Sequence, residues 1–270
     1  MIRLIASDMD GTLLDPDKNF PPDFFDILDK LEKYNIKFVV ASGRSYSALK
    51  PLFKERTDKM TFICDNGAFN VVDGKITGVN GLPDNKLKEI ISACKKYLPN
   101  VHLVLCGMNG TYISEEFNRQ SEEELGFYYF TRTVLNDLLD VNDTIFKIAI
   151  FDKKDPSENS FPVLNRLFKD SVELQISGSC WMDIMNPGVC KGAGLSILQK
   201  ELGISRSETM AFGDFYNDIS LLEQAEYSYV MENANDDMKK YGKYIAKSNA
   251  EYGVTKTISE YLSQLEKQNF

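Results

Sequence analysis

Apolar runs and helix-like apolar spacings alternate along the first third of the chain. Runs at 2–7, 36–41 and 61–64 have the length of buried strands. After the first run, a pair of prolines opens an apolar spacing that fits one face of a helix, and residues 45–53 predict a second helix. This alternation favours a parallel sheet with helices on its faces.

The middle of the chain has a different pattern. Apolar segments at 69–72 and 75–79 flank Asp73-Gly74, which predicts a tight hairpin. A helical spacing at 84–97 follows, and then come closely spaced strand patterns with helical patterns between them. The expected strands are 101–106, 111–114, 145–151, 172–177 and 181–185, and the expected helices are 133–140 and 156–168. Strands this close together favour antiparallel pairing.

The last third returns to the first pattern. Residues 191–202 predict a helix that ends at Gly203, and strands and helices alternate after it. The expected strands are 209–212, 227–231 and 244–246, and the expected helices are 218–224, 235–241 and 254–265. We therefore expect an α/β fold with a doubly wound, mostly parallel core made of residues 1–81 and 187–270. An α+β domain of residues 82–186 is inserted between the two halves of this core.

Composition limits the classes of partner. The chain has 270 residues, 43% of them hydrophobic, which is ample for a packed core. Its net charge of −9 disfavours a general affinity for nucleic acid or for an anionic membrane, although a local anion site is compatible with it. No apolar run approaches the roughly 18 residues of a membrane span. The oligomeric state stays open.

Cysteine and histidine usage narrows the picture further. Five dispersed cysteines without a C-x-x-C pair indicate reduced thiols and a cytoplasmic location. Acidic residues interrupt the apolar stretch at the N-terminus, which disfavours a signal peptide. With His102 as the one histidine of the chain, a histidine-rich metal site is excluded.

The strongest chemical signal is an acid pair, Asp8 and Asp10, at the end of the first strand and before a glycine turn. Carboxylates this close repel each other, so that one pKa should rise unless a cation joins them. The spacing suits an oxygen-rich site for a hard divalent ion, with one aspartate left to attack phosphorus.

Four polar clusters lie where strands end or helices begin. Parallel strands bring their carboxyl ends to one edge of a sheet, which is where ligands bind in open α/β folds. Each cluster alone has a plainer explanation: turn chemistry, a helix cap, a favourable charge at a helix end, or a solvated lysine. Together they indicate a phosphate group bridged to a divalent metal. The clusters are Asp8/Asp10, Ser42-Gly43-Arg44, Lys191-Gly192, and Gly213 to Asp218.

In its motifs and their order, the chain resembles the haloacid dehalogenase superfamily, in particular the Cof-type phosphatases with a large C2 (type IIB) cap. The matching segments are Asp8-Met9-Asp10-Gly11-Thr12, Ala41-Ser42-Gly43-Arg44, Asp65-Asn66-Gly67-Ala68, Lys191-Gly192 and Gly213-Asp214-Phe215-Tyr216-Asn217-Asp218. An insertion between the early and the late motifs matches the position of the cap.

The resemblance implies a role for each motif residue. Asp8 would be the nucleophile that forms an aspartyl-phosphate, and Asp10 would be the general acid and then the base. Mg²⁺ would be held by Asp8, the Asp10 backbone carbonyl and Asp214, with Asp218 bound directly or through water. We expect the crowded acids to raise the pKa of Asp10, although the metal acts in the opposite direction.

The phosphate would be held by groups from both halves of the core. The resemblance implies that Ser42 and Lys191 hold the phosphoryl oxygens, and that Gly43 allows close backbone approach. Arg44 would contact the substrate. The amides of Asn66 and Asn217 would bind phosphate or neighbouring groups.

Three functions stay open at this point. The leading hypothesis is a Mg²⁺-dependent phosphatase of small phosphomonoesters, such as sugar phosphates. A phosphomutase or phosphotransferase of the same superfamily is the alternative, and a receiver-like phosphate-binding module is the third. The sequence does not say which cap residues face the substrate. The candidates include the aromatic cluster 127–130 and the neighbours Trp181 and Met182.

Overall fold

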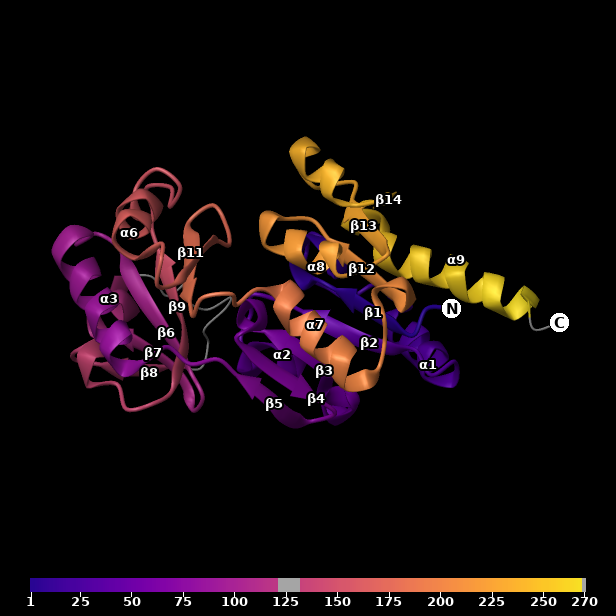
Figure 1. Ribbon diagram of the computed structural model, residues 1–270, viewed down its shortest axis with the longest axis horizontal. Coiled ribbons are helices and arrows are strands. Elements are labelled where there is room, and N and C mark those ends of the chain that lie inside the picture. The colour runs from indigo at the N-terminus through magenta and orange to yellow at the C-terminus, as the bar shows by residue number, and fades with distance from the viewer. Residues whose placement is uncertain (121–131, 269–270) are drawn as a thin grey trace.

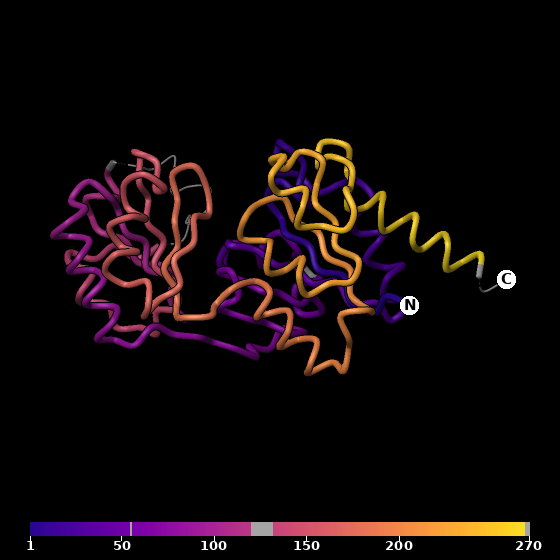
Figure 2. Tube along the Cα trace, turned by 45° about the horizontal axis from the view of Figure 1, so that its top comes forward, coloured from indigo at the N-terminus to yellow at the C-terminus, as the bar shows by residue number. Residues whose placement is uncertain are grey.

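The computed structural model describes residues 1–120 and 132–268. It has two lobes, each built around its own sheet and joined by two crossings of the chain (Figure 1). Figure 2 shows the two crossings running side by side between the lobes. Asn186, on the returning crossing, ties them together through hydrogen bonds to the Asn80 side chain (2.7 Å) and the Gly81 carbonyl (2.6 Å).

The core sheet has eight strands, in the order β14-β13-β12-β1-β2-β3-β4-β5. All neighbours from β14 to β3 are parallel, and β4 and β5 add an antiparallel hairpin at one edge. Asp73 and Gly74, at its tip, both have positive φ, as the predicted tight turn requires. The strands are β1 (Leu4–Ser7), β2 (Lys37–Ala41), β3 (Thr61–Cys64), β4 (Phe69–Val72), β5 (Lys75–Val79), β12 (Thr209–Gly213), β13 (Tyr227–Met231) and β14 (Tyr244–Ala246).

Helices cover both faces of the core sheet. One apolar cluster joins one face of the strands to α1, α2 and α9, and a second joins the other face to α7 and α8. The helices are α1 (Phe24–Lys33), α2 (Tyr46–Phe53), α7 (Lys191–Leu202), α8 (Ile219–Glu223) and α9 (Gly253–Gln268). Short π or 3-10 turns lie at Met9–Leu13, Lys54–Lys59, Asp65–Gly67, Arg206–Glu208, Tyr216–Asp218, Asp236–Tyr241 and Asn249–Glu251. The predicted doubly wound α/β core is confirmed.

The inserted lobe, or cap, has a six-stranded sheet in the order β10-β11-β9-β6-β7-β8. Its neighbours are antiparallel except for β7 and β8. The helices α3 and α6 pack on one face of this sheet through a separate apolar cluster. The elements are α3 (Asp84–Tyr97), β6 (His102–Gly107), β7 (Gly110–Ser114), α4 (Glu115–Gln120), β8 (Thr133–Leu135), a 3-10 turn (Leu138–Asp140), β9 (Ile145–Phe151), α6 (Ser160–Phe168), β10 (Glu173–Ile176) and β11 (Trp181–Met185).

The other face of the cap sheet is turned toward the core. On β9 and β11, the residue pairs Phe151/Trp181, Ala149/Asp183 and Lys147/Met185 lie opposite one another on this face. Their apolar members belong to the same cluster as α1 and α2 of the core. The alternation of side chains along the two strands thus gives the cap sheet one face for its own helices and one for the core.

Three helix predictions were wrong in part or in whole. The segment 133–140 forms β8 and a 3-10 turn instead of a helix, because Thr133 and Val134 pair with β7 and the Asp137 side chain accepts a hydrogen bond from the Leu139 amide (2.8 Å). The helix expected from 156 begins at Ser160, after a turn closed by Asp155. Residues 236–241 form a 3-10 helix, and α4 was not predicted.

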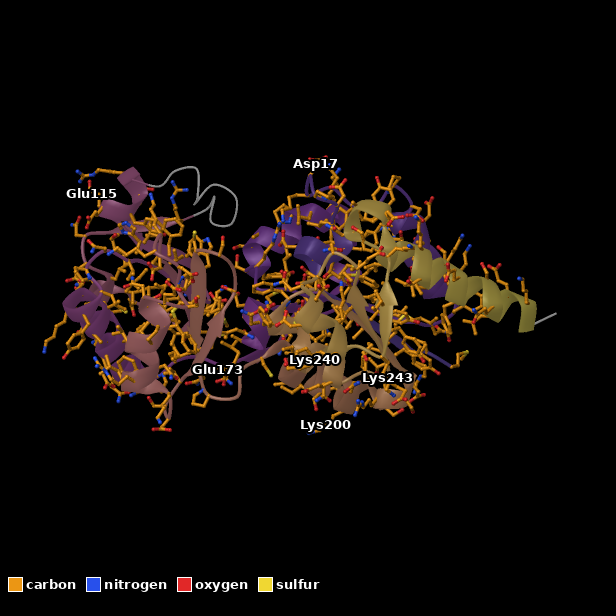
Figure 3. All side chains as sticks on the ribbon, turned by 90° about the horizontal axis from the view of Figure 1, so that it is seen from above. Asp17, Glu115, Glu173, Lys200, Lys240 and Lys243 are labelled. Atoms are coloured by element: carbon orange, nitrogen blue, oxygen red, sulfur yellow. The ribbon has the colours of Figure 1, made fainter. Side chains whose placement is uncertain are left out.

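Charged side chains of both signs lie on the outer surface. Figure 3 shows Glu115 on the cap and Lys200 and Lys243 on the core pointing outward, and all three are exposed. Within the described residues, every helix is too short or too polar to cross a membrane.

Candidate active site

The predicted polar clusters meet at one edge of the core sheet. Asp8 follows β1, Ser42 follows β2 and Asp214 follows β12, so parallel pairing places all three at the carboxyl ends of neighbouring strands. They line a cavity of about 860 Å³ between this edge and the inner face of the cap. Both lobes therefore contribute to the site.

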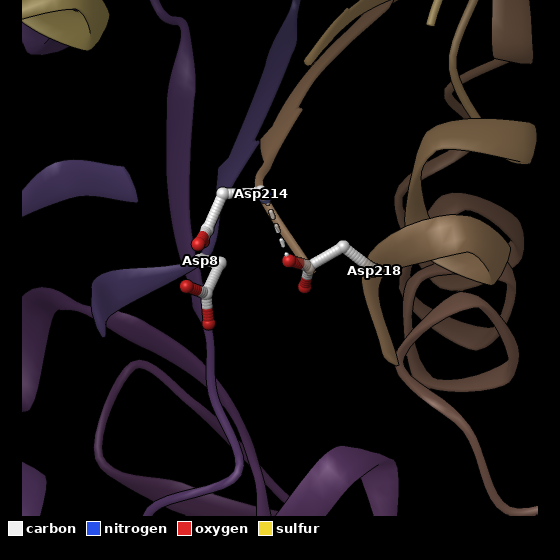
Figure 4. Close-up of side chains that lie close together, drawn as sticks. All are labelled: Asp8, Asp214 and Asp218. Carbon is white, nitrogen blue, oxygen red and sulfur yellow. Dashed lines mark hydrogen bonds between the residues drawn. The ribbon is translucent and has the colours of Figure 1, made fainter. Parts of the chain in front are cut away.

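Three carboxylates converge at the base of the cavity. Asp8, Asp214 and Asp218 each place an oxygen within 4.8 Å of the others (Figure 4). Asp218 is fixed by the backbone amide of Asp214, which donates to its Oδ2 at 3.0 Å, and Thr12 donates to Asp214 at 2.6 Å. Gly11 has a φ of 81°, and a side chain there would collide with the Asp214 carboxylate.

Two of these carboxyl groups, those of Asp8 and Asp214, have a raised pKa. Burial raises the pKa of Asp8 well above its ordinary value, and the carboxylates of Asp218 and Asp214 add to this despite the nearby Lys191 ammonium. Burial and the Asp218 carboxylate raise the pKa of Asp214 to about 7. Such a group relieves its repulsion by binding a cation.

Hard oxygen donors in this number fit Mg²⁺. The set comprises Asp8, Asp214 and Asp218, three of the four predicted metal ligands. The side chain of Asp10, the fourth, is engaged elsewhere, and its predicted contribution was through the backbone carbonyl.

Lys191 lies beneath the carboxylates and is fully buried. Its Nζ is 2.7 Å from Asp8 Oδ1 and 2.6 Å from Asp218 Oδ1. Burial lowers the pKa of Lys191, but the carboxylates of Asp218 and Asp8 outweigh this effect and raise the pKa above its ordinary value. The alternative of a solvated surface lysine is thereby excluded, and the ammonium is a fixed positive charge beside Asp8.

Asp10 is held by two cations. Arg44 donates to both of its oxygens at 2.6 Å, and Lys18 donates to Oδ1 at 2.8 Å. Burial raises the pKa of Asp10, but the hydrogen bonds and charges of Arg44 and Lys18 outweigh it and lower the pKa. The expectation of a raised pKa was wrong for this reason: the crowding acids are Asp8 and Asp214, whereas Asp10 faces cations.

The remaining predicted residues lie beside the cavity or in contact with residues that line it. Ser42, Gly43, Arg44 and Asn217 line it. Asn66 lies behind them, where its Oδ1 accepts from Asn217 Nδ2 at 3.1 Å. The structure thus brings the whole predicted set together.

Among the residues that sequence reasoning missed at this site are Thr12 and Lys18 of the core, and Lys147 and Asp183 of the cap. Lys147 Nζ donates to the Gly43 carbonyl at 2.7 Å, and Asn66 Nδ2 donates to Asp183 Oδ2 at 2.7 Å. Both cap residues are almost fully buried. A signal for them exists, because each is a lone charge within an otherwise apolar strand, β9 or β11.

The cap provides an aromatic wall opposite the carboxylates. The rings of Phe151 and Trp181 lie 4.9 Å apart, and both line the cavity. Met182, the other candidate of this strand, belongs to the apolar core of the cap. His102 stacks on Phe117, with ring centres 4.4 Å apart. The cluster 127–130 lies outside the described residues.

Residues 5–258 match the family of haloacid dehalogenase-like hydrolases. The chain belongs to this family. It is a phosphatase of this family. The resemblance inferred from the motifs is thereby confirmed.

The hydrolase is similar over almost its whole length to several proteins. The 5-amino-6-(5-phospho-D-ribitylamino)uracil phosphatase YbjI of Escherichia coli K12 is 31% identical over 266 residues, which cover 97% of this chain and 96% of the relative. Among solved structures, SMU.1108c of Streptococcus mutans UA159 has a TM-score of 0.91 and 29% identity, covering 97% of this chain and all of that chain. The subclass IIB sugar phosphatase BT4131, at 22% identity and a TM-score of 0.81 over 96% of this chain and 98% of its own, shares the fold with its inserted cap.

Proposed function

We propose that this hydrolase removes the phosphoryl group from small phosphomonoesters in two displacements at Asp8. The observation that supports this most directly is the placement of Asp8. Its carboxylate lines the cavity, is held by the buried ammonium of Lys191 at 2.7 Å, and has Asp10 two residues away on the same edge. Nucleophile, fixed positive charge and a second acid are the parts that a covalent phosphoryl transfer needs.

In this proposal Asp8 attacks phosphorus, and the ester oxygen leaves with a proton from the protonated fraction of Asp10, which the cations Arg44 and Lys18 keep small. Water then attacks the aspartyl-phosphate, with Asp10 accepting its proton. Lys191 and Ser42 hold the phosphoryl oxygens. The ammonium of Lys191 neutralises the charge that develops on these oxygens, and the Ser42 hydroxyl donates a hydrogen bond to one of them. Asp8, Asp214 and Asp218 would hold Mg²⁺, which supplies further neutralisation of the phosphoryl charge when bound.

The leaving group would lie toward the cap. Along β9, Lys147, at the phosphate end, and Phe151, at the aromatic wall, are four positions apart, a span of about 13 Å at the usual rise per residue. A metabolite with a phosphorylated chain and a planar ring fits these dimensions. The Escherichia coli relative is named for a substrate of this kind, in which a phosphorylated ribityl chain is joined to uracil. We propose ring-bearing phosphomonoesters as the preferred substrate class. We also propose that the protein works in the cytoplasm, because its five cysteines are free thiols.

A screen of phosphorylated metabolites tests the reaction. Purified protein with Mg²⁺ should release inorganic phosphate, and Asp8→Asn should abolish release while leaving the circular dichroism spectrum unchanged. Formation of an isomerised phosphate ester without release of inorganic phosphate would instead identify a phosphomutase. Full activity of Asp8→Asn would refute the role of Asp8.

A further inference from the structure

Two charged cap residues reach into the core behind the phosphate-binding loop Ser42-Gly43-Arg44. Lys147 of β9 places its ammonium 2.7 Å from Asp65 Oδ1 and 2.7 Å from the Gly43 carbonyl. Lys147 and Asp65 are at most 2% exposed, so this is a buried ion pair between the two lobes. Asp183 of β11 adds a second cap contact, to the side chain of Asn66.

The core segment that receives these contacts has an unusual backbone. Asp65, Asn66 and Gly67 have φ values of 48°, 55° and 99°, three consecutive residues in the left-handed region. Side chains other than glycine rarely adopt this conformation, and it persists where the surroundings impose it. Here the surroundings include the cap, because Lys147 holds the Asp65 side chain and Asp183 holds that of Asn66.

This turn and Lys147 together fix the phosphate-binding loop. The Asn66 amide donates to the Ser42 carbonyl at 3.1 Å, and the Asp65 amide donates to the Arg44 carbonyl at 3.1 Å. Lys147 donates to the carbonyl between them, that of Gly43. All three successive carbonyls of the loop are therefore held, and the middle one is held by the cap.

The carbonyl of Gly43 belongs to the same planar peptide as the amide of Arg44, so fixing one orients the other. In a trans peptide the two groups point in opposite directions. The Arg44 amide donates to the Ser42 hydroxyl oxygen at 3.1 Å. This leaves the hydroxyl hydrogen of Ser42 to be donated to a phosphoryl oxygen.

We propose that Lys147 is a positioning residue of the phosphate site, which acts through the Gly43–Arg44 peptide on the hydroxyl of Ser42. The inference rests on the proposed phosphatase function. It makes the docked cap part of the phosphate site: movement of β9 away from the core would release the Gly43 carbonyl and with it the orientation of Ser42. Phosphate affinity and cap closure are then coupled, so that opening favours release of the inorganic phosphate product.

The first test replaces Lys147 by methionine, which keeps the length of the side chain and removes its ammonium. With p-nitrophenyl phosphate as the probe, we expect kcat to fall and the inhibition constant of inorganic phosphate to rise, each by about tenfold or more, as for the loss of a charge-assisted hydrogen bond. Because this variant leaves Asp65 buried without its ion-pair partner, its stability should also fall. The double variant Lys147→Met/Asp65→Asn removes that charge, so it should recover the melting temperature but not the phosphate affinity. Recovery of both would overturn the proposal.

A double-mutant cycle with Ser42→Ala tests the route. If Lys147 acts on phosphate through the Ser42 hydroxyl, Lys147→Met should raise the inhibition constant of phosphate far less in the Ser42→Ala background than in the wild type. Additive effects would overturn the proposed route. Asp152→Asn is the matched control, because Asp152 is a buried cap acid whose side chain accepts hydrogen bonds from three cap residues: Lys154, Asn159 and Ser160. It should lower stability without changing phosphate affinity.

Hydrogen exchange separates this inference from the proposed function. In Lys147→Met the backbone amide of Arg44 should exchange faster. The backbone amide of Ser42 should be unaffected, because it donates to the Ile63 carbonyl of the neighbouring strand at 2.8 Å. Unchanged exchange at Arg44 would overturn the positioning role even in an active phosphatase. Absence of phosphate release by the wild type would refute the proposed function, while the exchange measurement would still report on the loop.

Discussion

Arg44 forms a bidentate ion pair with Asp10, with Nε donating to Oδ2 and Nη2 donating to Oδ1, both at 2.6 Å. The guanidinium side chain is only 12% exposed, so water screens the pair weakly. Arg44 therefore holds Asp10 in its ionised form at neutral pH. Arg44, which we expect to contact the substrate, thus also contacts the proposed general acid, and this contact sets how readily that acid carries a proton.

We expect Arg44→Met to raise the pKa of Asp10, because burial then acts with only Lys18 opposing it. If Asp10 protonates the leaving group, the alkaline limb of the kcat/KM profile moves to higher pH in this variant. The profile is measured from acidic to alkaline pH at saturating Mg²⁺. Lys18→Met is the control. Lys18 donates to one oxygen of Asp10 where Arg44 donates to both, and its side chain is 41% exposed, so the pKa shift in this variant should have the same direction and be smaller. Unchanged profiles in both variants would show that Asp10 does not control the alkaline limb.

Without divalent ions, the stability of the fold should depend on pH through the buried carboxylates of the metal site, and through Asp214 above all. The pKa of Asp214 is about 7 in the folded protein, against about 4 in an unfolded chain. An acid whose pKa is raised on folding binds its proton more tightly in the folded state, so deprotonation favours unfolding. In chelator, the melting temperature should therefore fall as pH rises from about 4 to about 7.

Mg²⁺ should reverse this loss, with its largest effect at the upper end of the range, where the carboxylates are ionised. Thermal melts with chelator and with Mg²⁺, at several pH values, measure both effects. Asp214→Asn serves as the matched comparison, since it removes one of the repelling charges and should flatten the pH dependence in chelator. A melting temperature that rises with pH in chelator would contradict the assignment.

The sequence predicts the residues at the catalytic edge of the sheet well, because the topology of the sheet fixes where its motifs lie. Asp8, Ser42 and Asp214 each follow a parallel strand, and neighbouring parallel strands bring such residues together whatever their separation in sequence. Burial of the strands and the strict alternation of elements are enough to specify this arrangement. The hairpin at Asp73-Gly74 was predicted from a local signal, the turn chemistry of these two residues between two apolar segments.

The contacts between the lobes were not predictable in the same way. Lys147 and Asp183 are visible in the sequence as charges within apolar strands. Their partners Asp65 and Asn66 lie in the other lobe, and no local sequence pattern predicts how the cap docks on the core. The sequence also does not predict that the Arg44 side chain points toward Asp10. The direction of the pKa shift of Asp10 was therefore predicted wrongly. The helix expected at 133–140 failed because side-chain hydrogen bonding and strand pairing outweighed an apolar spacing.

Trp181 should set the preference for the leaving group. Its ring lines the cavity beside Phe151, and stacking against a planar group is worth about 0.5–1.5 kcal/mol beyond the area buried. We therefore expect Trp181→Ala to lower kcat/KM for a ring-bearing phosphomonoester by about tenfold, mainly through KM. For a short substrate such as glycerol phosphate, which cannot reach the wall, the change should be small.

Trp181→Phe keeps an aromatic face and should retain most of the preference, which separates stacking from a general disturbance of the cap. Tyr97→Ala provides the control for an aromatic deletion elsewhere on the cap, since Tyr97 ends α3, is 47% exposed and does not line the cavity. Steady-state kinetics of all three variants on both substrates measures the preference as a ratio of kcat/KM values, in which differences in active fraction cancel. An equal loss on both substrates in Trp181→Ala would mean that the wall supports the cap and does not select the ring.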